Sequence, residues 1–272
     1  MAIKTEWIGY GNRSGYFALP EHAATPLPAV IVIQEIWGVN DHIEDVTRRI
    51  AAAGYAALAP DLFSENGQRP APLTRERVAE IMAFMSRIPP AAWGDQALRE
   101  AELQKLPATE RGRIAETYGS LFGMTQEKRE SFAAPLREAV RLLRHERAET
   151  KEQPIACVGF CMGGGLSALL ACEEPELSGA AVFYGATPAP EKVARIGCPV
   201  IAFYGANDGR VNAGIPAFEE GMKKIGKPYE HHVYQGTGHA FFNDSRGSYD
   251  VKAARDSFAR LLAFFSRVLT EG

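Results

Sequence analysis

A cysteine between two glycines stands out among the residues that could perform chemistry. In the stretch VGFCMGGG, residues 158–165, Gly159 and Gly163 flank Cys161, after a short apolar run and before a helical pattern. In a G-x-C-x-G turn from a strand into a helix, the central side chain is exposed on a strained backbone, and larger residues at the glycine positions would clash. The helix N-terminus favours the thiolate, which is the reactive form of cysteine. The motif predicts that Cys161 is a nucleophile; the alternative is a buried structural cysteine beside helix-packing glycines.

Two later residues supply the partners that such a nucleophile needs. Asp208 follows the apolar run CPVIAFYG, and His239 lies in a GTGH loop after the next predicted strand, YEHHVYQ. The order nucleophile, acid, histidine, each at the end of a strand, is the order of α/β-hydrolases. Singly, Asp208 could cap a turn and His239 could be a loop histidine with a backbone partner. Together, the three matches predict a Cys161–Asp208–His239 triad.

The segment QEIWG, residues 34–38, follows the first strong strand pattern. At this position the fold supplies the second backbone N–H of an oxyanion hole, so we expect the N–H of Ile36 to act with that of Met162. Glu35 would lie at the mouth of the pocket, where a carboxylate is costly unless it is hydrogen-bonded. Two roles stay open for Glu35, which are accepting the thiol proton and bracing the loop.

The elements that must position these residues alternate between strands and helices. Such alternation predicts an α/β fold with a mostly parallel central sheet and helices on both faces. Thr125 is placed to cap a helix, and Pro135 should kink or divide that same helix. Short strand patterns, most of them apolar, predict strands at 29–33, 55–60, 154–160, 179–185, 198–205 and 229–235, and helical spacing predicts helices at 42–54, 123–145 and 248–269.

Residues 64–125 interrupt this alternation. Five prolines (Pro70, Pro72, Pro89, Pro90 and Pro107) separate short helical patterns there. The segment is long for a connection and too patterned for disorder. We therefore expect a helical insertion or lid within one domain that spans residues 1–272.

The composition argues against several classes of function. With a net charge of -3, the 272 residues offer no basic field for nucleic acid. The chain opens on a polar segment and contains no apolar run of the roughly 20 residues that a membrane span needs, so neither a signal peptide nor a membrane partner is expected. The four cysteines have no CxxC spacing, which favours a reducing cytoplasm. No metal-ligand or nucleotide-binding spacing occurs, so no metal and no cofactor are expected.

Blocks in order along almost the whole chain outside residues 64–125 resemble the dienelactone hydrolase family. They are residues 34–63, VGFCMGGG, the YG of AVFYG, YGANDGRVN and GTGHAFF. The resemblance implies an α/β-hydrolase with a Cys-Asp-His triad and no cofactor. It also implies that Cys161 is the nucleophile, that His239 is the general base and then the acid, and that Asp208 orients His239. Glu35 would restrain the resting thiol and accept its proton when substrate enters.

The chain departs from the family pattern where the substrate binds. Asn243 stands where the type enzyme of the family has an arginine that grips the substrate carboxylate. A second carboxylate-binding arginine of the family could correspond to Arg75 or Arg77, and Arg210 or Arg246 could anchor an anionic group instead. The residues expected beside the substrate are Trp37, Tyr184, Phe241, Asn243 and Arg77.

The sequence therefore predicts a cytoplasmic hydrolase, monomeric or dimeric, that cleaves a small ester or lactone through an acyl-cysteine intermediate. Two alternatives stay open. The same thiolate could attack an activated aryl phosphotriester. A hydrolase fold could also serve a non-catalytic protein that holds a small ligand, although the intact Cys161–Asp208–His239 set argues against it.

Overall fold

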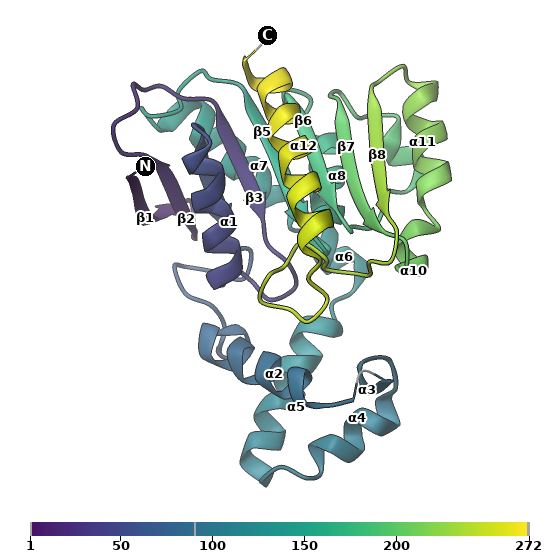
Figure 1. Ribbon diagram of the computed structural model, residues 1–272. Coiled ribbons are helices and arrows are strands. Elements are labelled where there is room, and N and C mark those ends of the chain that lie inside the picture. The colour runs from purple at the N-terminus through teal and green to yellow at the C-terminus, as the bar shows by residue number, and fades with distance from the viewer. Residues whose placement is uncertain (1, 90, 271–272) are drawn as a thin grey trace.

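Eight strands form one sheet at the centre of the protein (Figure 1). The computed structural model describes residues 2–89 and 91–270. The strand order is β1-β2-β4-β3-β5-β6-β7-β8, and every pairing from β4 to β8 in that order is parallel. The predicted mostly parallel α/β sheet is confirmed. The strands are β1 (Ile3–Tyr10), β2 (Arg13–Pro20), β3 (Ala29–Ile33), β4 (Ala56–Pro60), β5 (Ile155–Phe160), β6 (Gly179–Phe183), β7 (Val200–Gly205) and β8 (Tyr229–Tyr234).

The N-terminal hairpin was not predicted from the sequence. β1 and β2 pair antiparallel, with Ile3 opposite Pro20, and β2 continues the sheet by antiparallel pairing with β4. β1 is an edge strand, and most of its residues are exposed or half-buried. It therefore lacks the continuous apolar run that marks the central parallel strands, such as the fully buried β3.

Helices cover both faces of the sheet, as predicted (Figure 1). α1 and α12 pack on one face, where their apolar side chains share one core with the sheet. α7, α8 and α11 pack on the other face and contribute to the second core. The sheet is thus shielded from water on both sides, which explains why its central strands are apolar throughout. The bounds are α1 (Asp41–Ala52), α7 (Ala133–Arg141), α8 (Met162–Glu173), α11 (Ile215–Lys224) and α12 (Val251–Thr270).

The helix predicted at 123–145 is divided. Thr125 caps its first part, since its hydroxyl oxygen accepts a hydrogen bond from the N–H of Lys128 at 3.1 Å. α7 restarts at Ala133, so Pro135 lies in the first turn, where no intrahelical N–H is required. The effect predicted for Pro135 is therefore confirmed. The three parts are α6 (Gln126–Glu130), α7 and the π-helix η2 (Leu142–Glu146).

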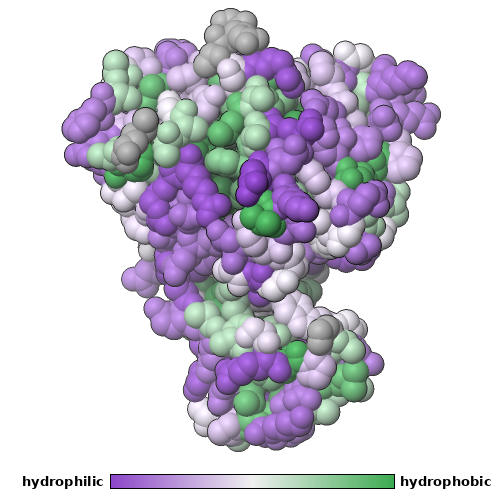
Figure 2. All heavy atoms as spheres, viewed as in Figure 1, coloured by the Kyte–Doolittle hydropathy of each residue, from purple (hydrophilic) through white to green (hydrophobic). Residues whose placement is uncertain are grey.

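The segment 64–125 forms a helical lobe that projects beyond the carboxyl edge of the sheet (Figure 1). α2 and α5 pack together, and an ion pair of 2.8 Å between Arg77 and Glu116 links them. Figure 2 shows hydrophobic residues beside hydrophilic ones on this lobe, and Trp93 and Leu98 are exposed there. Within the described part of the chain, no helix combines the length and the apolar character needed to cross a membrane. The elements of the lobe are η1 (Ala71–Leu73), α2 (Arg75–Arg87), α3 (Ala91–Gly94), α4 (Gln96–Leu103) and α5 (Ala108–Phe122).

Backbone contacts require the glycines beside Cys161. A Cβ atom on Gly159 would lie 1.8 Å from the carbonyl oxygen of Gly163. A Cβ atom on Gly163 would lie 2.3 Å from the carbonyl oxygen of Ile33 and 2.4 Å from that of Gln34. The start of α8 therefore packs directly on the end of β3, a closeness that no larger residue allows.

We predict that Gly163→Ala destabilises the protein by about 1–3 kcal/mol, because backbone atoms of Ile33 and Gln34 leave the new methyl group no room. Urea denaturation of both proteins measures this difference in the free energy of unfolding. The matched control is Gly119→Ala in α5, where a Cβ atom meets nothing within 4 Å. That control should stabilise the protein by about 0.5–1 kcal/mol. Equal stability of Gly163→Ala and wild type would contradict the packing argument.

Candidate active site

Cys161 occupies a sharp turn between β5 and α8. Its backbone lies at φ 54° and ψ -115°, a conformation that costs a non-glycine residue about 1–3 kcal/mol. Backbone hydrogen bonds hold it there: its N–H donates to the carbonyl of Phe183 at 3.0 Å, and its carbonyl accepts from the N–H groups of Gly164 at 3.0 Å and Gly165 at 3.3 Å. Cys161 thus belongs neither to β5 nor to α8, and it lies between them at the carboxyl edge of the sheet.

The four cysteines differ sharply in exposure. Cys161 is half-buried, whereas Cys157, Cys172 and Cys198 are buried, and all four are free thiols. Burial raises the pKa of the Cys172 thiol to about 11 and that of Cys198 to about 12, and it raises the pKa of Cys157 as well. These three thiols are therefore poor nucleophiles near neutral pH, which leaves Cys161 as the accessible one.

Asp208 and His239 meet beside this cysteine. Asp208 lies between β7 and α10 (Gly209–Asn212), and His239 lies in the loop after β8. The Nδ1 atom of His239 is 2.5 Å from Oδ2 of Asp208. The two loops are joined, since the N–H of Asn207 donates to the carbonyl of Thr237 at 2.9 Å. The structure therefore brings the three predicted triad residues together.

The surroundings of His239 favour its protonated form. Burial lowers the pKa of His239, but hydrogen bonds to Asp208 and to the thiol of Cys161, with the negative charges of both groups, outweigh burial and raise it to about 10. The ring can therefore hold a proton next to the sulfur and return it to a leaving group.

Glu35 is a buried carboxylate in the loop after β3. It is 2% exposed, and its two oxygens have separate donors. The side-chain amide of Asn243 donates to Oε2 at 2.7 Å, and the Tyr184 hydroxyl donates to Oε1 at 3.4 Å. Burial and the nearby charge of Glu35 raise the pKa of Tyr184, so its hydroxyl keeps the proton that it donates. In the described residues the hydrogen bonds of Glu35 go to these two side chains and not to Cys161.

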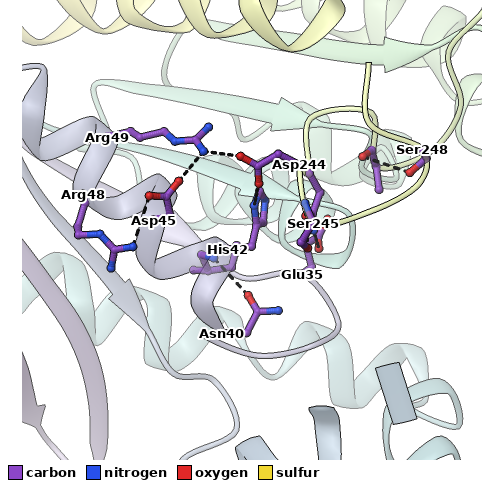
Figure 3. A network of polar contacts seen from close by, with 12 residues as sticks. Glu35, Asn40, His42, Asp45, Arg48, Arg49, Asp244, Ser245 and Ser248 are labelled. Carbon is purple, nitrogen blue, oxygen red and sulfur yellow. Dashed lines mark hydrogen bonds and ion pairs between the residues drawn. The ribbon is translucent and has the colours of Figure 1, made fainter. Parts of the chain in front are cut away.

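The loop that carries His239 and Asn243 is fastened to α1 (Figure 3). Asp244 lies between Arg49, at 2.5 Å, and Nδ1 of His42, at 3.5 Å. Although partial burial raises the pKa of Asp244, the hydrogen bond and charge of Arg49 outweigh it, and the pKa is lowered. Asp45 also contacts Arg49, at 2.5 Å. This ion-pair network fixes the loop from outside, while Asn243 binds Glu35 inside.

Ile36 and Met162, whose backbone N–H groups are predicted to form an oxyanion hole, lie beside Cys161. Both residues line the cavity that contains Cys161. Met162 is the first residue of α8, so no preceding helical turn accepts its N–H. The contact of Gly163 with the end of β3 holds the two loops close together. A negative oxygen on a carbonyl carbon attacked by Cys161 would be stabilised by such donors.

A cavity of about 690 Å³ opens beside the triad. Cys161 and His239 border it together with aromatic side chains from both the sheet edge and the helical lobe. Among the described residues that line it, Glu35 is the one carboxylate and three arginines are the strongly basic side chains. The aromatic residues are Trp37, Trp93, Tyr118, Phe122 and Tyr184, and the arginines are Arg129, Arg210 and Arg246.

The residues predicted to contact substrate lie in different places. Trp37 and Tyr184 line the cavity. Phe241 is fully buried behind Tyr184, with 5.5 Å between the ring centroids, and Asn243 is buried beside Glu35. Arg77 pairs with Glu116 in the lobe. Arg75 binds Asp41 at 2.8 Å and also Glu44. Neither arginine lines this cavity.

Arg246 joins the sheet edge to the lobe. Its guanidinium carbon lies 4.7 Å from the ring centroid of Trp37 and 5.4 Å from that of Trp93 in α3. Burial lowers the pKa of Arg246, which shows how far its cation is withdrawn from water. Trp93, Tyr118 and Phe122 were not predicted, because nothing in the lobe sequence distinguishes residues that face the sheet edge from residues that pack within the lobe. Arg129 was not predicted either, since its place beside Cys161 depends on how α6 packs.

Known proteins resemble this chain over nearly its full length. The model of the dienelactone hydrolase family matches residues 14–269. A protein of Saccharolobus solfataricus, provisionally named carboxymethylenebutenolidase, is 36% identical over 255 residues, which is 93% of each chain. A crystal structure from Klebsiella pneumoniae, provisionally titled a dienelactone hydrolase, has a TM-score of 0.71 and 26% identity and covers 98% of this chain and 100% of its own. A dienelactone hydrolase-like promiscuous phosphotriesterase from metagenomic libraries shares the fold, with a TM-score of 0.67, 21% identity, and coverage of 99% of this chain and 100% of its own.

We predict that Asp208→Asn lowers the pKa of His239 by at least about one unit, because the substitution removes the negative charge and replaces the ionised acceptor of a 2.5 Å hydrogen bond by a neutral amide, which accepts more weakly. Both influences raise the pKa in the wild type, so their loss must lower it. NMR titration of the histidine ring signals measures the change, and the exposed His145 serves as the internal control. An unchanged His239 titration would show that Asp208 does not set the charge of the ring.

Proposed function

Since the chain belongs to the dienelactone hydrolase family, we propose that it hydrolyses a small ester or lactone with Cys161 as the nucleophile. The observation that carries the proposal is the 2.5 Å contact of His239 with Asp208, beside the half-buried Cys161. The four cysteines of the protein are free, which supports the cytoplasm, a reducing compartment, as its location. No cofactor enters the proposed reaction.

In the first half of the reaction the sulfur of Cys161 attacks the carbonyl carbon of the substrate. The thiol proton is held by His239, and the carbonyl oxygen becomes an oxyanion that accepts hydrogen bonds from the N–H groups of Ile36 and Met162. When the tetrahedral intermediate collapses, the bond to the alcohol oxygen breaks and His239 donates its proton to that oxygen. A thioester on Cys161 and a free alcohol result.

In the second half, water replaces the alcohol beside His239. The ring takes a proton from the water as the oxygen attacks the thioester carbon, and the same two N–H groups stabilise the second oxyanion. Collapse breaks the carbon–sulfur bond, releases the carboxylic acid and restores the Cys161–His239 pair. Asp208 keeps Nδ1 of His239 occupied throughout, so the other ring nitrogen does the proton transfers.

We predict that Cys161→Ala lowers kcat/KM for p-nitrophenyl acetate and butyrate by about a thousandfold or more, because no sulfur remains to form the thioester. Mass spectrometry of quenched wild-type reactions should find the acyl group on the peptide that contains Cys161. Cys172→Ala, which removes a buried thiol away from the site, is the matched control. Activity that survives in Cys161→Ala would mean that the half-buried thiol is structural.

The same assay separates the two alternative functions. An aryl phosphotriester turned over faster than the carboxylic esters would identify phosphorus as the preferred electrophile. A protein that hydrolyses none of these compounds, and whose Cys161 resists alkylation, would be a ligand-binding protein on a hydrolase fold. The paired Asp208 and His239 favour catalysis, since a binding protein has no need of them.

We further propose that Glu35 takes part in activating the thiol. Glu35→Gln keeps the size of the side chain and an acceptor for Asn243, but it removes the negative charge. We predict that the rate of Cys161 alkylation by iodoacetamide near pH 7 falls on the order of tenfold, equivalent to a change of one pKa unit in an activating group. Glu220→Gln, on the exposed side of α11, is the control. An unchanged rate with an unchanged Tm would leave Glu35 as a brace of the loop.

A further inference from the structure

Cys161 stands where two cavities meet. Besides the cavity of about 690 Å³, a smaller one of about 150 Å³ lies between α6, α8 and the loop after β6 that leads into α9 (Pro190–Val193). The two share a wall, because the same residues line both. These are Arg129, Cys161, Met162, Ala186 and Thr187. A substrate whose carbonyl carbon reaches the sulfur therefore has space on two sides.

The position of His239 distinguishes the two sides. His239 and Ile36 line the larger cavity and not the smaller one. In the proposed reaction His239 must reach the alcohol oxygen to protonate it, so the alcohol half of the ester belongs in the larger cavity. The acyl half extends from the other side of the same carbonyl carbon, toward the smaller cavity.

We propose that the smaller cavity binds the acyl group of the substrate, and that this acyl group is short and carries a negative charge that pairs with Arg129. The inference rests on the proposed function, since it takes the direction of proton transfer from that mechanism. The substrate class inferred for that reaction is the monoesters of small dicarboxylic acids.

The volume and the apolar lining of the smaller cavity limit the length of the acyl chain that fits. Leu166 and Leu169 from α8 and Ala189 provide apolar surface. Engineered apolar cavities of about 150 Å³ admit benzene, so the space fits a chain of about six non-hydrogen atoms. A longer acyl chain would extend beyond this space and lose the contact with its apolar residues.

Arg129 supplies the charge. Its Nε atom is buried and lacks a hydrogen-bond acceptor in the part of the chain that the structure describes. Lys192 and Glu130, the other two charged residues that line the smaller cavity, neutralise each other in an ion pair of 2.7 Å. Among the described residues that line the cavity, Arg129 is thus the one cation without an ionic partner, and a carboxylate on the acyl chain would supply that partner.

The length of the acyl chain is tested with Leu169→Trp, whose indole fills the smaller cavity. We predict that the ratio of kcat/KM for ethyl pentanoate to that for ethyl acetate falls by about tenfold or more relative to wild type. The ratio for butyl acetate to ethyl acetate, which varies only the alcohol, should stay the same. Together the two series show which half of the ester the cavity holds.

The charge is tested with Arg129→Met on ethyl hydrogen succinate and ethyl pentanoate, which have acyl chains of similar size. The kcat/KM ratio of the charged to the uncharged ester should fall by about tenfold or more, the value of one hydrogen-bonded charge. Arg137→Met, which removes an exposed arginine of α7 that does not line the cavity, is the matched control and should leave the ratio unchanged.

The outcomes separate this inference from the proposed function. If the wild type hydrolyses no ester, or Cys161→Ala retains activity, the proposed function fails. If ester hydrolysis depends on Cys161 but Leu169→Trp changes the alcohol series, or changes neither series, the acyl assignment is overturned. A charge ratio that Arg129→Met leaves unchanged overturns the assignment of the dicarboxylic monoesters.

Discussion

The strained backbone of Cys161 is the constraint on which the rest of the site depends. A residue at φ 54° between β5 and α8 is unfavourable by itself, and it persists because neighbouring backbone groups hold it on both sides. Gly159 and Gly163 leave room for this turn, and Gly163 also brings α8 against the end of β3. One conformation therefore sets the position of the sulfur, of the Met162 N–H and of the loop that contributes Ile36. Any residue that relaxed the turn would move all three groups together.

A buried carboxylate imposes the second requirement. Glu35 loses most of its hydration, and this cost is offset by the amide of Asn243 and the hydroxyl of Tyr184. The family pattern has an arginine at the position of Asn243. Here that side chain is neutral and is used up in holding Glu35, so it offers no charge to a substrate. Three residues after Asn243, Arg246 places a cation at the cavity wall. Its guanidinium lies near the indole rings of Trp37 and Trp93.

Local patterns explain what the sequence predicted. Five of the six parallel strands, β3 to β7, are continuous apolar runs, whereas β8 at the edge is mixed, and the triad residues follow β5, β7 and β8 in the order that the fold requires. The hairpin at the N-terminus was missed because β1 lies at the edge of the sheet and is largely solvated. Side-chain direction was the harder problem. Phe241 and Asn243 are only two and four residues from His239, yet both face inward, because the loop turns at Ala240, whose φ of 61° reverses the chain. The contribution of Trp93, Tyr118 and Arg129 depends on how the lobe and α6 dock, which helical spacing does not encode.

The unequal sizes of the two cavities bear on how a thioester would be cleared. Once the alcohol has left, the cavity of about 690 Å³ is open to water, and His239 lines it. An acyl chain held in the cavity of about 150 Å³ would not block that route. In the proposed reaction, water would therefore approach the thioester along the path by which the alcohol left, and the same ring nitrogen would serve both halves, in keeping with microscopic reversibility. A lactone differs in one respect, because its alcohol stays tethered to the acyl group after ring opening. It must then swing away from His239 before water can enter, so the volume of the larger cavity matters most for a cyclic substrate.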